Sequence, residues 1–143
     1  MINKARVRKL VKELRTTKKN QGHGKLHKRE NTVHYYCCLG IGCEVAIKNG
    51  CKVTVTSRTP HNRMTVYHYD ESWLTLPDSV KKWYGFSDSD PILIENKNVT
   101  ASALNDDYNW SFKRIATAFE KRFLAPTKRL AAAKKSATKT AKK

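Results

Sequence analysis

The sequence predicts an α+β fold, with four to five short helices packed around a small antiparallel β-hairpin and a disordered basic C-terminal tail. Apolar residues recur at helical spacing near both ends of the chain, which is typical of amphipathic helices. Residues 52–57 and 64–69 alternate and are rich in β-branched and aromatic side chains, as strands are. From residue 126 onward, Lys, Ala and Thr leave too little apolar surface to fold alone. We therefore expect one domain over residues 1–125 and a tail over residues 126–143.

An amphipathic helix is predicted from about Asn3 to Thr16. Its apolar side chains fall at positions i, i+3, i+4 and i+7, and its opposite face is basic. The apolar stripe consists of Val7, Leu10, Val11 and Leu14. Residues 17–33 follow without an apolar period and with two glycines, so we expect a basic loop there.

A buried central helix is predicted within the segment YCCLGIGCEVAIKNG, residues 36–50. Apolar residues recur at helical spacing from Tyr36, and Gly50 stands where a glycine commonly ends a helix. Gly40 and Gly42 lie in the interior, where each costs up to about 1 kcal/mol relative to alanine. A helix that contains both glycines is therefore expected to be approached closely by a neighbouring segment.

An antiparallel hairpin is predicted from the two alternating segments, which the turn-like sequence RTPHNR joins at residues 58–63. A third helix follows, with Pro77 in its first turn and Gly85 as its cap. The sequence ILIE, residues 92–95, predicts a short strand.

The last two helical segments begin at residues that commonly cap helices. Thr100 opens a short helical turn, TASALND, and Ser111 opens a final helix that ends at Pro126. The apolar stripe of the final helix is Phe112, Ile115, Ala116, Phe119 and Phe123.

The net charge of +17 is concentrated at the two ends of the chain. Residues 1–30 contain eleven Lys or Arg and two Glu, a net of +9, and residues 126–143 contain seven Lys or Arg and no acid, a net of +7. Residues 31–125 hold eleven basic and ten acidic residues, a net of +1. Basic ends of this density favour binding to nucleic-acid phosphates, which releases condensed counterions.

Three blocks of sequence stand out in this order. They are Tyr-Cys-Cys-Leu-Gly-x-x-Cys-Glu from Tyr36 to Glu44, Leu-Pro-x-x-Val-x-x-Trp from Leu76 to Trp83, and Leu-Asn-Asp…Ser-Phe-x-x-Ile-Ala from Leu104 to Ala116. Together they resemble a family of small uncharacterised proteins encoded by tailed bacteriophages. The resemblance spans about residues 8–124 and implies a phage protein made in a bacterial cytoplasm. It implies no reaction, and the basic tail departs from it.

The four cysteines have the spacing C-C-x₄-C-x₇-C, which fits no common zinc finger or ribbon. Unpaired cysteine is among the most buried residue types, and we do not expect the N-terminal residues to act as a secretory signal, so we expect free thiols that pack in the core. Redox or nucleophilic use of a cysteine is the alternative. We predict neither a metal nor a cofactor, and the weak candidates for a metal site are Cys37, Cys43, Cys51 and His34.

Motifs for catalysis are missing from the sequence. It contains no GxxxxGK[ST], GxGxxG or HExxH pattern. Acid pairs such as Asp70 and Glu71 lie beside turns, where capping accounts for them. We therefore predict that the protein is not an enzyme.

Tyr67 and Tyr69 share one face of the predicted hairpin. With Arg58, Arg63 and His68 nearby, an exposed face of this kind could stack bases. The alternative, which we prefer, is that this face covers a helix.

We predict a small phage-type accessory protein that binds DNA or RNA without reading sequence, through phosphate contacts from the N-terminal helix and the tail. The candidate residues on the helix are Lys4, Arg6, Arg8, Lys9, Lys12 and Arg15. Those on the tail are Lys128, Arg129, Lys134, Lys135, Lys139, Lys142 and Lys143.

Two alternatives stay open. The same charges would steer an effector or interaction module towards an acidic host protein, and an internal virion protein would use them to neutralise the packaged genome. No run of 18 apolar residues occurs, so a membrane partner is not expected. We expect the protein in the cytoplasm of the infected bacterial host, or in the virion.

Overall fold

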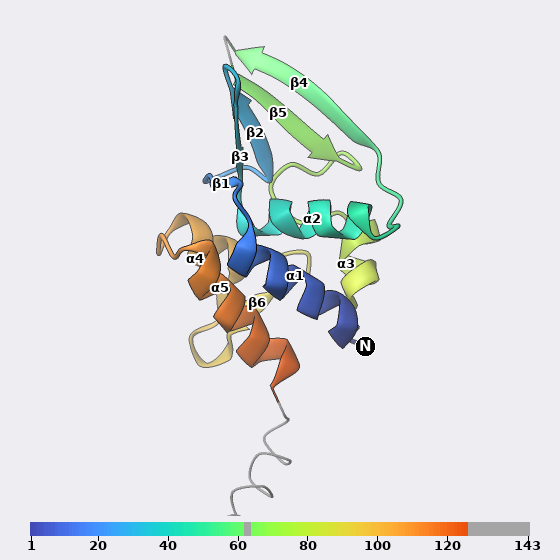
Figure 1. Ribbon diagram of the computed structural model, residues 1–143, viewed down its shortest axis with the longest axis vertical. Helices are drawn as coiled ribbons and strands as arrows, with labels where there is room; N and C mark the ends of the chain where they lie inside the picture. The colour runs from blue at the N-terminus through green and yellow to red at the C-terminus, as the bar shows by residue number, and fades with distance from the viewer. Residues whose placement is uncertain (62–63, 126–143) are drawn as a thin grey trace, which may run out of the picture.

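The computed structural model describes residues 1–61 and 64–125, and Figure 1 shows how they are arranged. It confirms the α+β fold class. In chain order the elements are α1 (Lys4–Thr16), β1 (Asn20–Gln21), β2 (His27–Glu30), β3 (Val33–Tyr36), α2 (Cys38–Lys48), β4 (Val55–His61), β5 (Met64–Tyr69), α3 (Asp78–Tyr84), β6 (Ile92–Ile94), the 3₁₀ turn η1 (Glu95–Lys97), β7 (Val99–Thr100), α4 (Ala101–Asp106), α5 (Phe112–Phe119) and the π-helical turn η2 (Glu120–Leu124). The predicted tail, residues 126–143, lies outside the described residues.

Five strands form one sheet in the order β1-β3-β2-β5-β4. Strand β1 pairs parallel with β3, and the other neighbours pair antiparallel. The predicted pairing of β4 with β5 is confirmed, but these strands are one edge of a larger sheet. Because a two-stranded hairpin is marginal alone, the pairing of β5 with β2 explains how it is stabilised. A separate ribbon pairs β7 with β6, the short strand predicted from ILIE.

The loop predicted for residues 17–33 is wrong, because this segment contributes β1 and β2. The sequence of β2, HKRE, shows no apolar alternation, yet β3 and β5 pair with it on both sides. Backbone hydrogen bonds to β3 and β5 stabilise this strand. Backbone pairing of this kind cannot be recognised from the pattern of side chains in the sequence. The hairpin differs too, since β4 begins at Val55 rather than Lys52 and runs through the predicted turn to His61.

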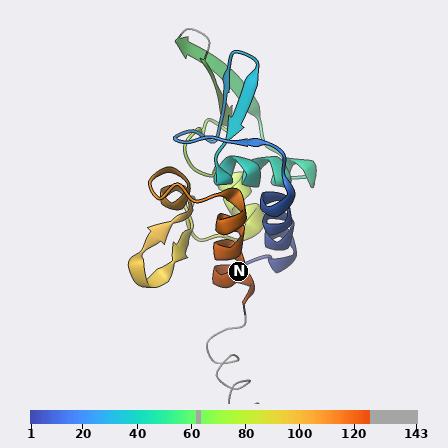
Figure 2. The same cartoon turned by 60° about the vertical axis from the view of Figure 1, so that its left-hand side comes forward.

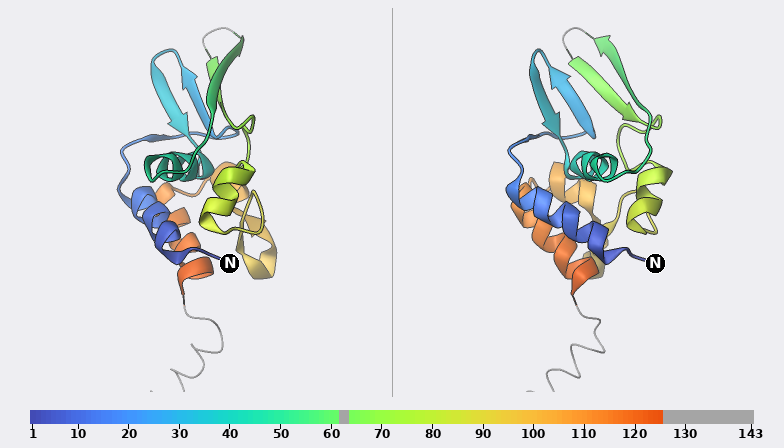
Figure 3. Two further views of the ribbon diagram at one scale, coloured as in Figure 1. Left: turned by 90° about the vertical axis from the view of Figure 1, so that its right-hand side faces the viewer. Right: turned by 45° about the vertical axis from the view of Figure 1, so that its right-hand side comes forward.

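Helix α2 separates the sheet from the other helices. In Figure 1 the sheet stands on one side of α2 and α1, α4 and α5 lie on the other, and the turned views in Figures 2 and 3 keep this order. Helices α1 and α5 lie side by side and run in opposite directions (Figure 3). Within residues 1–61 and 64–125, no helix combines the length and apolar character needed to cross a membrane.

The predicted central helix is confirmed, although it begins at Cys38 rather than Tyr36. Tyr36 ends β3, and the Sγ of Cys37 accepts a hydrogen bond from the backbone N–H of Gly40 at 3.4 Å. Most of α2 is buried, from Cys38 to Cys43 without interruption. Helix α2 therefore packs against both the sheet and the helical layer.

The two interior glycines of α2 have different surroundings. A Cβ atom on Gly40 would collide with the carbonyl oxygen of Leu26, so glycine is required for the chain to pass this close to the helix. A Cβ atom on Gly42 would find its nearest neighbours at 3.8 Å, an ordinary contact distance. Close approach of a neighbour, as predicted, therefore explains Gly40 and does not explain Gly42.

The caps predicted at Thr100 and Ser111 are in place, and Asn3, where the first helix is expected to begin, caps α1 in the same way. The side chains of Asn3, Thr100 and Ser111 each accept a hydrogen bond from a backbone N–H of the helix that they begin. Gly85 ends α3 with a φ of 82°, a left-handed conformation that favours glycine. Pro77 stands at the N-cap of α3, one position before the predicted one.

Candidate nucleic-acid interface

The six basic residues predicted on the N-terminal helix fall into two groups. The exposed ones are Lys4, Arg8, Lys9 and Lys12, and the half-buried ones are Arg6 and Arg15. The apolar stripe on the opposite side of α1 is buried and packs against α2 and α5. Helix α1 therefore presents a row of cations to solvent.

Arg6 fastens α1 to α3. Its Nη1 donates a hydrogen bond to the carbonyl oxygen of Trp83 at 2.9 Å, and its guanidinium carbon lies 4.5 Å from the centre of the Trp83 ring. A cation over an indole face is attracted by the ring quadrupole. These contacts commit Arg6 to holding the helix in place, and we assign it to the border of the candidate interface.

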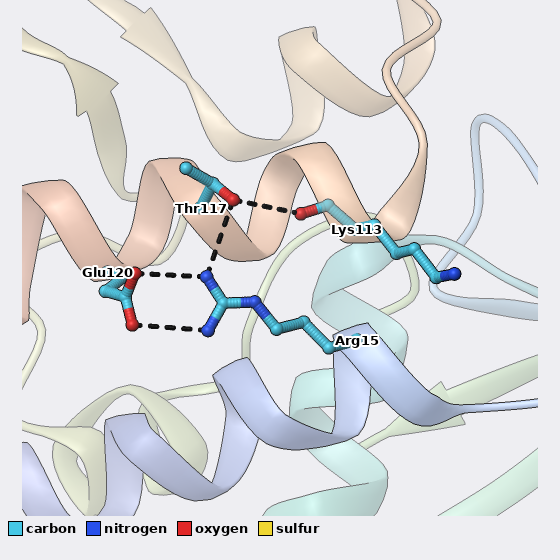
Figure 4. Close-up of polar contacts among 4 residues, drawn as sticks. All are labelled: Arg15, Lys113, Thr117 and Glu120. Atoms are coloured by element: carbon cyan, nitrogen blue, oxygen red, sulfur yellow. Dashed lines mark hydrogen bonds and ion pairs between the residues drawn. The ribbon is translucent and has the colours of Figure 1, made fainter.

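Arg15 connects α1 to the end of α5, as Figure 4 shows. Its Nη1 and Nη2 donate to the two carboxylate oxygens of Glu120 at 3.2 and 3.0 Å, and Nη2 also donates to Thr117 Oγ1 at 3.5 Å. The hydrogen bonds to Glu120 raise the pKa of Arg15, and the same bonds lower the pKa of Glu120. The side chains of Arg15 and Glu120 are 39% and 47% exposed, so solvent screens their attraction and the pair adds little to the free energy of unfolding. Its main effect is to fix the position of α1 relative to the end of α5.

A row of cations borders the seam between α1 and α5. Lys4, Arg8 and Lys12 recur every four residues, so they lie on one side of α1. A shallow hollow of about 250 Å³ follows the seam, and Arg8, Lys12 and Arg15 line it from α1. Glu120 lines it from the opposite side.

Helix α5 and the turn η2 that follows it add a second row, which the sequence does not predict as part of an interface. Lys113 and Lys121 are exposed and flank Thr117 at a spacing of four residues. In Figure 4, Lys113 extends from α5 on the side that faces α1. The spacing is visible in the sequence, but nothing in the sequence shows that α5 is the neighbour of α1.

We call Lys4, Arg8, Lys12, Lys113 and Lys121 the basic seam. Among the residues that the structure describes, none of these five takes part in an ion pair. The single acidic side chain that lines the seam hollow, Glu120, is already paired with Arg15. Lys4 and Lys121 line a separate hollow with Asp88 and Glu95, and Glu95 is paired with Arg122. The five cations of the basic seam outnumber the acidic side chains of the two hollows, so the seam carries a net positive charge that is available to an anionic partner.

Lys9 points away from the seam, towards the end of α2. Its Nζ donates to Asn49 Oδ1 at 3.1 Å, and another hollow there is lined by Lys9, Lys12, Glu13 and Lys48. This side of α1 carries one acidic residue among its cations, so its positive charge is partly offset.

The seven predicted contacts of the tail lie outside the described residues. They begin at Lys128 and end at Lys143. The structure consequently places only the helical part of the predicted interface.

The weak metal candidates do not form a cluster. Cys37 caps α2, Cys43 lies in the core, and Cys51 donates a hydrogen bond to the carbonyl oxygen of Ser79 at 3.6 Å. His34 lies on β3 and contacts His27 instead. Across residues 1–61 and 64–125, no group of three or more His, Cys, Asp or Glu side chains is arranged to hold a metal ion.

The prediction that cysteines pack in the core is confirmed for Cys37, Cys38 and Cys43, which are buried. Burial raises the pKa of Cys37 to about 12 and raises the pKa of Cys38 and Cys43 well above the ordinary value. These three thiols are therefore protonated at neutral pH, and a protonated thiol is a poor nucleophile and metal ligand.

His27 forms the centre of a buried polar chain between the sheet and α2. Tyr69 donates its hydroxyl proton to Glu44 Oε2 at 3.0 Å, and Tyr69 Oη lies 3.0 Å from His27 Nδ1. His27 Nε2 lies 2.7 Å from His34 Nδ1. Burial, with contributions from His34 and Lys19, lowers the pKa of His27 to about 3.

The aromatic face of β5 covers a helix, as preferred from the sequence. Tyr69 is fully buried, and Tyr67 stacks on His27 with ring centres 3.9 Å apart. This face is therefore closed to a stacking base. His68 and Val66 point to the opposite face of the sheet, where the strand alternation places them.

A family model described as a domain of unknown function, DUF8296, matches residues 2–123. The match covers α1 and almost all of η2, so it includes every residue of the basic seam. No curated protein and no solved structure matches the chain.

Proposed function

Since this chain belongs to the DUF8296 family, whose description leaves the activity open, we propose from its surface that it binds nucleic acid through phosphate contacts. The basic seam supplies the ordered contacts, and the lysine-rich tail predicted from the sequence adds further ones. The observation that carries this proposal is the net positive charge of the seam, where two rows of exposed cations meet on neighbouring helices.

The spacing of the cations along α1 suits a partner with regularly spaced negative charges. An α-helix rises about 1.5 Å per residue, so Lys4 and Lys12 are roughly 12 Å apart along α1. A row of cations of this length spans more than one backbone phosphate. Phosphate contacts position a protein on nucleic acid without reading the bases, so we expect binding to many sequences.

The resemblance to phage proteins favours the cytoplasm of an infected bacterium as the place of action. An internal virion protein bound to the packaged genome would use the same contacts at a different location. Mass spectrometry of purified phage particles separates these two settings.

The test is a salt titration with fluorescent duplex DNA and full-length protein. In the test variant, Lys4, Arg8 and Lys12 are all replaced by glutamine. Each lost phosphate contact lowers the slope of log affinity against log salt by about 0.9, so the slope is expected to fall by up to about 2.7. Fluorescence anisotropy at several salt concentrations measures both affinity and slope.

The matched control replaces Lys52, Lys82 and Lys97 by glutamine, which removes the same charge from exposed positions outside α1 and α5. It is expected to change the slope much less. Equal slopes in the two variants would contradict an interface on the seam. A stoichiometric, salt-resistant complex with an acidic host protein that survives nuclease treatment would contradict the nucleic-acid proposal as a whole.

A further inference from the structure

A further hollow, which is also lined by basic residues, lies on the face of the sheet that points away from α2. It has a volume of about 410 Å³, within the range of small-ligand sites. We call it the sheet groove, and the lining residues that matter here are Lys25, Arg58, Met64, Val66, His68 and Trp73. Strands β4 and β5, which supply four of them, lie in the part of the sheet that stands clear of the helices (Figures 1 and 3).

The groove has an apolar floor and an aromatic wall. Val66 on β5 is 5% exposed, whereas the indole of Trp73 is 37% exposed and follows the end of β5. The carbonyl oxygen of Trp73 accepts a hydrogen bond from the backbone N–H of Leu26 at 2.9 Å, which holds the backbone of Trp73 beside the chain that enters β2. The exposed part of the indole offers a surface for a flat ring.

Among the residues that the structure describes, one buried polar atom in the groove has no hydrogen-bond partner. His68 is 8% exposed, and its Nδ1 is buried without a hydrogen bond among the described residues. Its ring lies 6.2 Å from that of Trp73, centre to centre. Buried ring nitrogens are usually hydrogen-bonded. Because His68 lines the hollow, a turn of its ring would bring the unpartnered Nδ1 to the polar edge of a bound ring.

The rim of the groove is cationic. The Nζ of Lys25 lies 4.4 Å from the centre of the Trp73 ring. Arg58 pairs with Glu71 at 2.8 Å, but both side chains are mostly exposed, so solvent screens that pair. Two cations therefore border the aromatic wall, where the phosphates on either side of a stacked base would lie.

We propose that the sheet groove binds one unpaired base of a single-stranded nucleic acid. This inference rests on the proposed function and names its substrate class. The base stacks on Trp73 and meets His68 with its polar edge, while Lys25 moves from the indole to the adjoining phosphate. A single strand offers a flat ring, polar ring edges and flanking negative charge together, and bases inside a duplex are not free to enter a groove.

The test compares three fluorescent probes with full-length protein: an oligothymidylate, an abasic oligomer of equal length, and a duplex. Trp73→Ala is expected to weaken binding of the oligothymidylate by roughly tenfold or more, because stacking on an aromatic side chain contributes strongly to each bound base. The same variant is expected to keep its affinity for the abasic oligomer and the duplex within about twofold of the wild type. Trp73→Phe is expected to restore most of the loss, and Tyr108→Ala is the control at an exposed aromatic residue elsewhere.

Failure of this inference and failure of the proposed function give different results. Suppose that all three probes bind with a steep salt dependence, but Trp73→Ala changes the affinity for none of them or for all three equally. The groove proposal is then overturned, while the proposal that the basic seam binds phosphates is supported. If no probe binds to the wild type at low salt, both proposals fall. Tighter binding of an acidic peptide of matched charge than of the oligothymidylate would also overturn the groove proposal.

Discussion

His27 is a single side chain whose charge state the fold dictates. Tyr69 donates its proton to Glu44, so its oxygen accepts from His27 Nδ1. The other ring nitrogen, Nε2, is then left to accept from His34. A second proton on His27 would also require His34 to give up its Nδ1 proton, and burial, the main cause, lowers the pKa of His27 to about 3.

This arrangement predicts a loss of stability in acid. In the unfolded chain the pKa of histidine is near 6.5, so between about pH 6.5 and 3 the unfolded state holds a proton that the folded state lacks. The free energy of unfolding should therefore fall as pH drops, by about 1.4 kcal/mol per unit below 6.5, or about 2 kcal/mol at pH 5. Urea unfolding at pH 7 and pH 5 measures the difference.

Two histidine variants show how much of the loss of stability in acid is due to His27 and how much is due to other titrating groups. His27→Gln should lose most of the difference between pH 7 and pH 5, because the titrating group is gone. His23→Gln, at an exposed histidine, should keep it. The same pH dependence in both variants would show that His27 is not the origin.

At the scale of elements, the close packing of α2 against Leu26 depends on Gly40 and not on Gly42. Gly40→Ala forces a Cβ atom against the carbonyl oxygen of Leu26, so α2 or the chain before β2 must shift. We expect a loss of about 1–3 kcal/mol or more, as for other overpacked sites. Gly42→Ala meets its neighbours only at 3.8 Å and should gain up to about 1 kcal/mol of helix propensity.

Guanidinium unfolding of the two alanine variants measures these opposite changes within one helix. The variants make the same substitution two positions apart, so they differ mainly in what the new methyl group meets. A loss of similar size in both would mean that close packing surrounds Gly42 as well.

Local chemistry made most of the elements predictable from the sequence. The caps at Thr100 and Ser111 and the apolar stripes of the first and last helices depend on near neighbours along the chain. Strand β2 depends on β3 and β5 instead, and its HKRE sequence carries no sign of them. The same limit applies to β4, whose pairing with β5 carries it through the sequence RTPH that resembles a turn.

At the scale of the whole molecule, the candidate interface was predictable only in part. Charge counting locates the basic ends of the chain, but it does not distinguish Arg6, which is held by Trp83, from Arg8, which is exposed. It also cannot reveal that Lys113 and Lys121 lie beside α1. Those facts arise from the packing of α1 against α3 and α5, which joins segments far apart in the sequence.

The sheet groove was predictable only in part, because the sequence names Arg58 and His68 beside a possible base-stacking face but does not bring Lys25 or Trp73 to them. Its residues come from the loop before β2, from β4 and β5, and from the loop that holds Trp73. The sequence put the possible stacking on Tyr67 and Tyr69 with His68 nearby, whereas the structure buries Tyr69 and places His68 on the opposite face. Only the assembled sheet brings His68, Trp73 and Lys25 together.

The most direct test of the central claim is a salt titration that compares the full chain with residues 1–125, against duplex DNA and single-stranded RNA. We predict that both proteins bind at low salt and that affinity falls steeply with salt. Removal of the tail should make the plot of log affinity against log salt concentration less steep. Residues 1–125 should still show a slope on DNA of about −0.9 for each phosphate contact that the basic seam makes. If residues 1–125 do not bind, or bind with no salt dependence, the basic seam is not a phosphate-binding surface and the account is contradicted.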